Sequence, residues 1–337
     1  MNLPQALQRY REEIAAEVAS IVPADGHPLY ESIRYQLGWS PSGLPHLGKC
    51  IRPALCLLAC DAVGGDRSHA LPAAAAIELI HNFSLIHDDI EDEDDVRHHR
   101  PTVWAAFGRD RGVVSGLALW SLAYKGLERA LDAGVSPQSV ATARALITEA
   151  CDQMIEGQHL DLSYETRGRV TLADYAAMIE RKTGALVAAS LQVGALLGGA
   201  PAEEIDRLGD FGRNLGISFQ IRDDVLGIWG EGSATGKPVG ADIAKKKKSL
   251  PIVHALEHVV GPDKNLLRHI YEKPMIDEAD VAAVLDILQR WNVRYFAGGL
   301  AEDYRAQAMA ALAQTHITSE ARRDFDELMS FMLQRDF

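Results

Sequence analysis

Residues 84–95 read SLIHDDIEDEDD, an apolar run that ends abruptly in acidic residues. The residues before it carry helical rather than alternating apolar patterning, so a helix is predicted to run into this stretch. On such a helix Asp88 and Asp92 lie on one face, with Asp89 beside them. Crowded carboxylates repel each other, and a hard cation bound only by oxygen atoms relieves that repulsion. The stretch therefore predicts a Mg²⁺ site and, because Mg²⁺ commonly shares its shell with phosphates, a diphosphate site.

Residues 216–227 read GISFQIRDDVLG and repeat this plan, with a long apolar helix followed by the pair Asp223 and Asp224. A single acidic cluster is more commonly a solvated helix end. Two such pairs at apolar helix ends favour the functional interpretation. We expect the two helices to face each other across a bundle and to hold a metal cluster between them.

The composition is that of a globular protein with a sizeable core, since 47% of the 337 residues are hydrophobic and 24% are charged. The net charge of −13 argues against nucleic acid as a partner. The four cysteines of the chain form no CxxC pair, which indicates a reduced protein. Met1–Tyr10 lacks a signal-peptide pattern, and Ala185–Ala200 is too short and glycine-rich to span a bilayer. We therefore expect a cytoplasmic protein without an integral membrane segment.

Helical patterning dominates the chain, because alanine and leucine are abundant and alternating β-branched residues are scarce. No linker is long or polar enough to mark a boundary, so a single all-α domain is predicted over residues 1–337, as a large helical bundle around a central cavity. The predicted helices are Leu3–Val22, Leu29–Leu37, Ile51–Val63, Leu71–Ile90, Thr102–Ala133, Pro137–Leu162, Leu172–Leu197, Ala202–Trp229, Ser249–Glu257, Asp277–Leu288, Asn292–Ala313 and Ser319–Gln334.

Cations should accompany the acidic sites if the ligand is a diphosphate. Lys49 and Arg52 are three residues apart at a predicted helix start, where the helix dipole adds positive charge. Each further cation alone would ordinarily be a solvated surface charge. These further candidates are Arg97, Lys182, Lys237 and the lysine run at residues 245–248.

Taken together, these residues resemble the polyprenyl synthetase family of trans-isoprenyl diphosphate synthases. The resemblance runs from about Gly48 to Leu256 in the family's motif order, and many ordered motifs are far more specific than any one. The motifs are GKxxRP (Gly48–Pro53), DDxxD (Asp88–Asp92), an arginine before Pro-Thr (Arg97, Pro101, Thr102), GQxxDL (Gly157–Leu162), KTG (Lys182–Gly184), FQxxDD (Phe219–Asp224) and GKxxGxDI with a downstream lysine (Gly236–Ile243, Lys247).

The resemblance implies the isoprenoid synthase type I fold, a homodimer and a Mg²⁺-dependent prenyltransferase. Such enzymes join isopentenyl diphosphate head to tail to an allylic diphosphate such as the dimethylallyl, geranyl or farnesyl compound. Three Mg²⁺ ions would bind with the allylic diphosphate on Asp88, Asp92 and Asp223, with Asp89 and Asp224 in support. Its oxygens would meet Arg97, Lys182 and Lys237, while Thr183 and Gln220 would line the cation's position.

The isopentenyl diphosphate would bind to Lys49, Arg52 and His81. Two further positions are assigned to substrate binding by the resemblance, namely His98 and Lys247. The allylic cation needs a dry apolar cavity, and the departing pyrophosphate would serve as the base.

Several positions depart from the family pattern. His98-His99 stands where an arginine and a glycine are usual, which weakens the isopentenyl site. Gly227 replaces the third aspartate of the second motif. Leu117 and Cys50 replace a common aspartate and a common arginine. We therefore expect an intact allylic site beside a weakened isopentenyl site.

Product length depends on what blocks the cavity below the first motif. Phe83 lies five residues before Asp88, about 7.5 Å along the helix. An aromatic residue there resembles short-chain synthases, so geranylgeranyl diphosphate is expected first and farnesyl diphosphate next. Phe83 as an ordinary core residue is the competing interpretation.

Two other classes of function stay open at this point. A class I terpene cyclase or head-to-head coupling enzyme shares the paired aspartates but does not need isopentenyl diphosphate. A non-catalytic subunit of a heteromeric synthase is disfavoured because the chain retains Asp88, Asp92 and Asp223.

Overall fold

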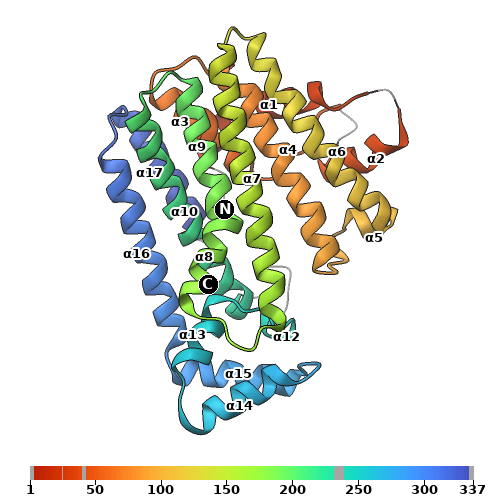
Figure 1. Cartoon of the computed structure of the whole chain (residues 1–337), viewed down its shortest axis with the longest axis vertical. Helices are drawn as coiled ribbons and strands as arrows, with labels where there is room; N and C mark the ends of the chain where they lie inside the picture. The colour runs from red at the N-terminus through yellow and green to blue at the C-terminus, as the bar shows by residue number, and fades with distance from the viewer. Residues whose placement is uncertain (1–3, 25, 40–42, 231–238, 334–337) are drawn as a thin grey trace. The chain divides into compact units, whose positions relative to one another are not determined.

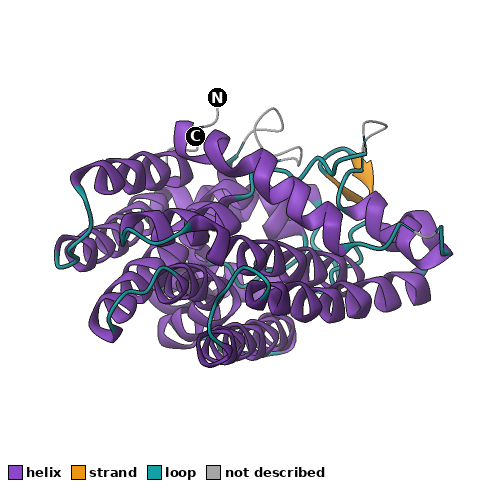
Figure 2. Ribbon diagram, turned by 90° about the horizontal axis from the view of Figure 1, so that it is seen from above, coloured by secondary structure: helices purple, strands orange, loops and turns teal. Residues whose placement is uncertain are grey.

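A computed structural model describes residues 4–24, 26–39, 43–230 and 239–333. Their regular structure is helical apart from one pair of two-residue strands (Figure 2). The predicted all-α class is confirmed. None of the helices in the described ranges combines the length and apolar character that crossing a bilayer requires.

The chain divides into two compact units. Unit 1 contains Met1–Cys151, Leu186–Gly212 and Ala311–Phe331, and unit 2 contains Asp152–Ala185, Arg213–Ala310 and Met332–Phe337. The single domain expected over residues 1–337 stays a prediction.

Unit 1 is built on α4 and α6, which run side by side (Figure 1). Two glycines one turn apart on α6 permit this packing. A Cβ atom at Gly112 would lie 2.9 Å from Ile90, and one at Gly116 would lie 2.3 Å from the ring of His87. The elements of unit 1 are α1 (Gln5–Ile21), α2 (Pro28–Gln36), α3 (Ile51–Ala62), α4 (Arg67–Glu91), β1 (Val96–Arg97), β2 (Arg100–Pro101), α5 (Val103–Phe107), α6 (Arg109–Leu127) and the 3-10 turn η1 (Glu128–Leu131).

Helix α4 carries the first acidic motif at its C-terminal end. Its N-cap residue is Asp66, whose side chain accepts a hydrogen bond from the Ser68 N–H. Its middle is buried on most sides because four successive small residues, 73–76, let α1 and α3 approach. The acidic motif therefore follows directly from the buried part of this helix.

Unit 2 has two clusters of buried apolar residues, one around Tyr175 and Ile221 and one around Ile228 and Ile287. Its elements are α8 (Leu172–Ile179), the π-helical turn η2 (Glu180–Gly184), α12 (Ala241–Ala244), α13 (Leu250–His258), α14 (Gly261–Glu272) and α15 (Glu278–Arg290). The helices with residues in both units are α7 (Pro137–Thr166), α9 (Ala185–Leu197), α10 (Ala202–Trp229), α16 (Val293–Ala313) and α17 (Ser319–Leu333).

Local features of the structure correct the predicted helices. The predicted helix 102–133 is broken at Gly108, whose φ of 90° is outside the helical region. The predicted helix 172–197 contains the π turn η2. Helix α14 was not predicted, because Gly261-Pro262 suggests a break, although proline fits well in a helix's first turn. The short β1–β2 hairpin was also missed.

Candidate functional site

The first acidic motif lies at the end of α4, in unit 1. The Asp92 N–H donates to the Asp88 carbonyl oxygen at 2.8 Å, so the helix extends to this residue. Asp88 and Asp92 are partly exposed, whereas Asp89 is only 2% exposed. The Asp89 carboxylate accepts a hydrogen bond from Arg97 Nε at 2.7 Å. Asp89 therefore lies against Arg97, whereas the other two aspartates are partly exposed.

Burial sets the charge state of Asp89. It raises the pKa of this carboxyl to about 6, although Arg97 opposes the shift. The ion pair thus stabilises the ionised form against the cost of burial. Asp89 consequently positions Arg97 beside the motif.

Arg97 belongs to the β1–β2 hairpin, in which it pairs with Arg100. The two residues of the turn, His98 and His99, have φ values of 49° and 61°. Two-residue hairpin turns of this kind favour glycine or asparagine at both positions. The hairpin is tied to α2, because the Tyr35 hydroxyl donates to the Pro101 carbonyl oxygen at 2.7 Å.

The predicted isopentenyl cations begin at the α3 N-terminus. Cys50 caps α3 with a left-handed φ of 49°, and its thiol donates to the Leu47 carbonyl oxygen at 3.0 Å. Arg52 Nη1 lies 3.1 Å from His81 Nε2, so the structure brings these two predicted residues together. Lys49 is exposed, with Nζ 5.3 Å from the centre of the Phe331 ring.

Phe83 is buried, and its ring lies edge-on to that of His87 at 4.9 Å between centroids. His87 in turn fills the space beside Gly116 of α6. The aromatic pair therefore lies between α4 and α6, directly before the acidic motif. This position is compatible with the predicted role of Phe83 and with a core role.

The second acidic motif lies on α10, in unit 2, and repeats the arrangement of the first. Asp223 is exposed and Asp224 is 7% exposed. The Asp224 carboxylate accepts three hydrogen bonds, from the Tyr175 hydroxyl at 2.6 Å, the Leu250 N–H at 2.8 Å and the Gln220 amide at 3.0 Å. Burial raises the pKa of Asp224 to about 7, against these three bonds. In both motifs, then, the second aspartate is anchored inside its own unit.

The KTG motif lies in the π turn η2, and such turns often occur at functional sites. Thr183 Oγ1 donates to Gln220 Oε1 at 2.7 Å, which joins two predicted residues into one network with Asp224. Lys182 Nζ donates to Asp161 at 2.5 Å. Burial alone would raise the pKa of Asp161, but Lys182 and Lys247 together lower it.

Glycine permits this approach of α7 to η2. A Cβ atom at Gly157 would lie 2.3 Å from the Lys182 backbone nitrogen, so no larger residue fits. Gly157 and Asp161 both belong to the GQxxDL motif. The GQxxDL motif was part of the family resemblance, but no role was predicted for either residue.

Gly227, where the family's third aspartate is expected, faces a different carboxylate. A Cβ atom at Gly227 would lie 2.0 Å from Asp242 Oδ2. Asp242 therefore fills the space that a side chain at position 227 would need. The Lys247 N–H donates to the Asp242 carbonyl oxygen at 2.9 Å. Lys237 lies outside the described residues.

The sequence interpretation missed several residues that hold the site together. They are Glu78 in unit 1 and Asp161, Tyr175 and Asp242 in unit 2. Asp161 and Asp242 lie within quoted motifs, which was the available signal. Tyr175 is revealed by the fold alone, since its hydroxyl donates to Asp224 on another helix, and Glu78 is revealed by its burial.

Oxygen-only ligand sets suit Mg²⁺, which keeps water molecules and shares phosphate oxygens. Among the described residues, no three His, Cys, Asp or Glu side chains come close enough to hold a cation by themselves. The partly exposed carboxylates of Asp88 and Asp92 fit a hydrated cation that also binds a phosphate. The residues present thus fit Mg²⁺ that arrives with a diphosphate ligand.

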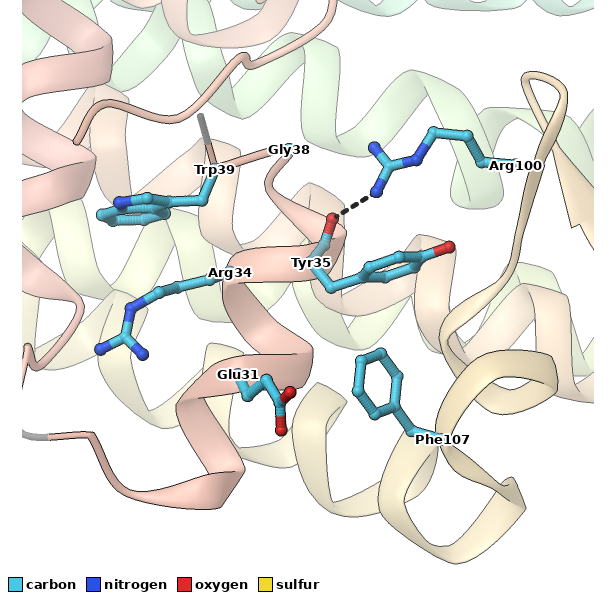
Figure 3. Close-up of a pocket in the computed structure, with 7 residues that line it drawn as sticks. All are labelled: Glu31, Arg34, Tyr35, Gly38, Trp39, Arg100 and Phe107. Carbon is cyan, nitrogen blue, oxygen red and sulfur yellow. Dashed lines mark hydrogen bonds between the residues drawn. The ribbon is translucent and has the colours of Figure 1, made fainter. Parts of the chain in front are cut away.

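A separate pocket of about 410 Å³ lies in unit 1 beside α2 (Figure 3). Arg100 donates to the Tyr35 carbonyl oxygen at 3.3 Å and lies over the Tyr35 ring. The predicted site residues are not among the described residues that line it. Those lining residues are Glu31, Arg34, Tyr35, Gly38, Trp39, Arg100 and Phe107.

Comparison with known proteins decides the family. The polyprenyl synthetase family model matches residues 42–288, which include both acidic motifs and the residues around them. The chain belongs to the polyprenyl synthetase family. The predicted resemblance is confirmed.

Relatives in the polyprenyl synthetase family align over most of this chain. A (2E,6E)-farnesyl diphosphate synthase of Mycobacterium tuberculosis is 39% identical over 310 residues, covering 90% of this chain and 85% of the relative. A geranylgeranyl diphosphate synthase of Sulfolobus acidocaldarius is 34% identical over 303 residues, covering 90% and 89%. The crystal structure of a geranylgeranyl pyrophosphate synthetase from Pyrococcus horikoshii superposes with a TM-score of 0.88 at 36% identity, covering 98% of both chains.

Proposed function

We propose that this chain condenses isopentenyl diphosphate head to tail with an allylic diphosphate and releases a short-chain trans-prenyl diphosphate. Family membership supports the reaction class. The observation that supports the proposal is the repeated acidic arrangement, in which Asp89 and Asp224 are buried and held within their own units while Asp88 and Asp223 are more exposed. Geranylgeranyl diphosphate is the first expectation for the product and farnesyl diphosphate the second, in line with relatives of both names.

Asp88, Asp92 and Asp223 are the proposed Mg²⁺ ligands, supported by Asp89 and Asp224. Three Mg²⁺ ions are proposed to bind with the allylic diphosphate and to compensate charge on the departing pyrophosphate. Prenyl synthases of this family are generally Mg²⁺-dependent, and the number of ions is our proposal.

The protein's own part is to bind, orient and exclude water. Arg97, Lys182 and Lys237 are proposed to bind the allylic diphosphate oxygens, and their positive charges favour the leaving group as its charge develops. Within unit 2, Asp161 holds Lys182 in place at 2.5 Å. The Thr183 hydroxyl donates a hydrogen bond to the Gln220 amide oxygen, and both side chains would present dipoles to the allylic cation. The departing pyrophosphate is the proposed proton acceptor.

The isopentenyl diphosphate is proposed to bind to Lys49, Arg52 and His81, with contributions from His98 and Lys247. Arg52 and His81 already share a hydrogen bond. Burial, together with Arg52 and Arg97, holds the pKa of His81 well below its usual range, so its imidazole is neutral. Arg52 thus carries the charge of this pair.

A homodimer is also proposed, and α6 offers the surface for it. Leu117 and Trp120 are 53% and 41% exposed, and Val113 and Val114 lie beside them on the same helix. Large apolar side chains grouped in this way commonly mark an interaction surface. A second copy of the chain is the proposed occupant. We also propose that the protein is cytoplasmic.

The direct test is incubation of the full chain with Mg²⁺, isopentenyl diphosphate and each of three allylic diphosphates, with products identified by mass. Prenyl diphosphates longer than the starter are expected. Hydrocarbon or alcohol made from the allylic substrate alone would replace the proposal with a cyclase. Absence of turnover with every starter would favour a non-catalytic subunit.

A further inference from the structure

Glu78 is a buried acid that the proposed reaction does not use. It lies on α4, one turn before His81 and Asn82, and is only 6% exposed. A carboxyl group is rarely buried without a hydrogen-bonded or charged partner. The structure provides both kinds of partner in unit 1.

The hydrogen-bonded partner is Asn82. Its Nδ2 donates to Glu78 Oε1 at 3.0 Å and to the Glu78 carbonyl oxygen at 2.9 Å. Gln36 Nε2 of α2 donates to Asn82 Oδ1 at 3.2 Å, which orients the amide. These hydrogen bonds orient the Asn82 amide so that its N–H donates to the Glu78 carboxylate.

Arg52 of α3 lies on the same side of α4 as Glu78, because its Nη1 is 3.1 Å from Nε2 of His81, one turn along α4. Burial lowers the pKa of Arg52, and the nearby Glu78 carboxylate and then Asp88 oppose this change. The Arg52 Nε atom is buried and has no hydrogen-bond partner among the described residues. A buried guanidinium with an unused donor is suited to receive a ligand oxygen.

We propose that Glu78 is the resident counter-ion of Arg52 in the unliganded isopentenyl subsite, and that it takes up one proton when a diphosphate assumes that role. This inference rests on the proposed function, because it takes Arg52 as a diphosphate ligand. The proton comes from solvent and binds to the carboxylate, and no covalent bond changes. Glu78 acts through Arg52 and is thus a positioning residue.

The physical reason is charge balance in a poorly solvated place. Burial raises the pKa of Glu78 to about 7, while Arg52 and the Asn82 hydrogen bond oppose the shift. A diphosphate on Arg52 adds negative charge near Glu78 and competes for the same cation, so the pKa of Glu78 must rise further. Above neutral pH the carboxylate then gains a proton on binding.

Other titratable or charged groups lie around Glu78, and all of them are present in both wild type and variant. From the loop before α3 comes the Cys50 thiol, whose pKa is raised by burial and then by Glu78. Helix α1 contributes Arg11 near that thiol. His81 and the ligand's own phosphate are present with both wild type and variant, so the difference in proton uptake reports on Glu78.

The test is calorimetric titration of isopentenyl diphosphate into the full chain, without metal or allylic substrate, at pH 8 in two buffers of different ionisation enthalpy. Wild type is expected to take up at least about 0.5 proton more per site than Glu78→Gln. The wild-type Kd should also rise roughly fivefold more than the variant's between pH 7 and pH 8.5. Glu204→Gln, another buried acid of unit 1, should match wild type.

Asn82→Ala provides a second route if Glu78→Gln does not fold. Loss of its N–H removes a bond that favours the ionised carboxylate, so more of Glu78 is protonated before the ligand arrives and proton uptake at pH 8 should fall. Equal uptake in wild type and the folded variants overturns the role of Glu78 and leaves the synthase proposal intact. If isopentenyl diphosphate binds with the expected proton uptake but no condensation product forms, the role of Glu78 is supported and the synthase proposal is rejected. Absence of isopentenyl diphosphate binding in wild type overturns both.

Discussion

At the scale of single residues, the two aspartates of each acidic pair lie in different surroundings. Asp89 and Asp224 are buried and make contacts within their own units, with Arg97 and Tyr175 respectively. The motif pattern predicted these aspartates as a group, but it did not predict which would turn inward. Inward orientation depends on partners from other elements, which spacing along one helix does not reveal.

Phe83 gives a prediction about product length. Phe83→Ala opens the space beside His87 and should shift products to longer chains, measured by mass after incubation with both substrates. Phe211→Ala removes another buried aromatic ring of unit 1 and serves as the matched control. An unchanged product distribution in Phe83→Ala would make Phe83 an ordinary core residue.

Gly227 gives a prediction that opposes the motif. Gly227→Asp restores the family's third aspartate but places its Cβ atom 2.0 Å from Asp242 Oδ2. Steric overlap and like charge should lower the free energy of unfolding by about 2 kcal/mol, measured by denaturant titration. Gly298→Asp, at a helical glycine with open space, should cost less. The double variant Gly227→Asp/Asp242→Gly should recover stability, and failure to do so would contradict the steric account.

At the scale of elements, patterning predicted the long helices well, and α10 matches its predicted bounds of Ala202–Trp229. The failures are local. Gly108 breaks a helix through a single positive φ, and η2 adds a π turn within a continuous apolar pattern. Neither feature changes hydrophobic periodicity, so periodicity does not reveal them. The β1–β2 hairpin is too short to show alternation.

The hairpin turn gives an element-scale prediction. His99 adopts a φ of 61°, which is unfavourable for a residue with a side chain. His99→Gly should therefore raise the free energy of unfolding by about 0.5–1 kcal/mol, measured by thermal and denaturant unfolding. His269→Gly within α14 should have the opposite effect, because glycine weakens a helix. Destabilisation by His99→Gly would show that the imidazole makes a contact worth more than the turn strain.

At the scale of the whole molecule, the apolar surface of α6 predicts self-association. Leu117→Glu should convert dimers into monomers, measured by analytical ultracentrifugation, because it places a charge in the proposed apolar interface. Leu266→Glu on α14 changes a comparably exposed leucine in unit 2 and should leave the mass unchanged. A monomeric wild type would remove the homodimer proposal.

The anchored aspartates also affect how a mutational survey of this enzyme must be scored. Replacement of Asp224 leaves three donors on separate segments without their acceptor, so the protein loses soluble yield as well as turnover. Replacement of the exposed Asp223 should reduce turnover at normal yield. A screen that records product alone would rank the two positions together. Normalising product to folded protein separates the residues that stabilise the fold from those proposed to bind the substrate.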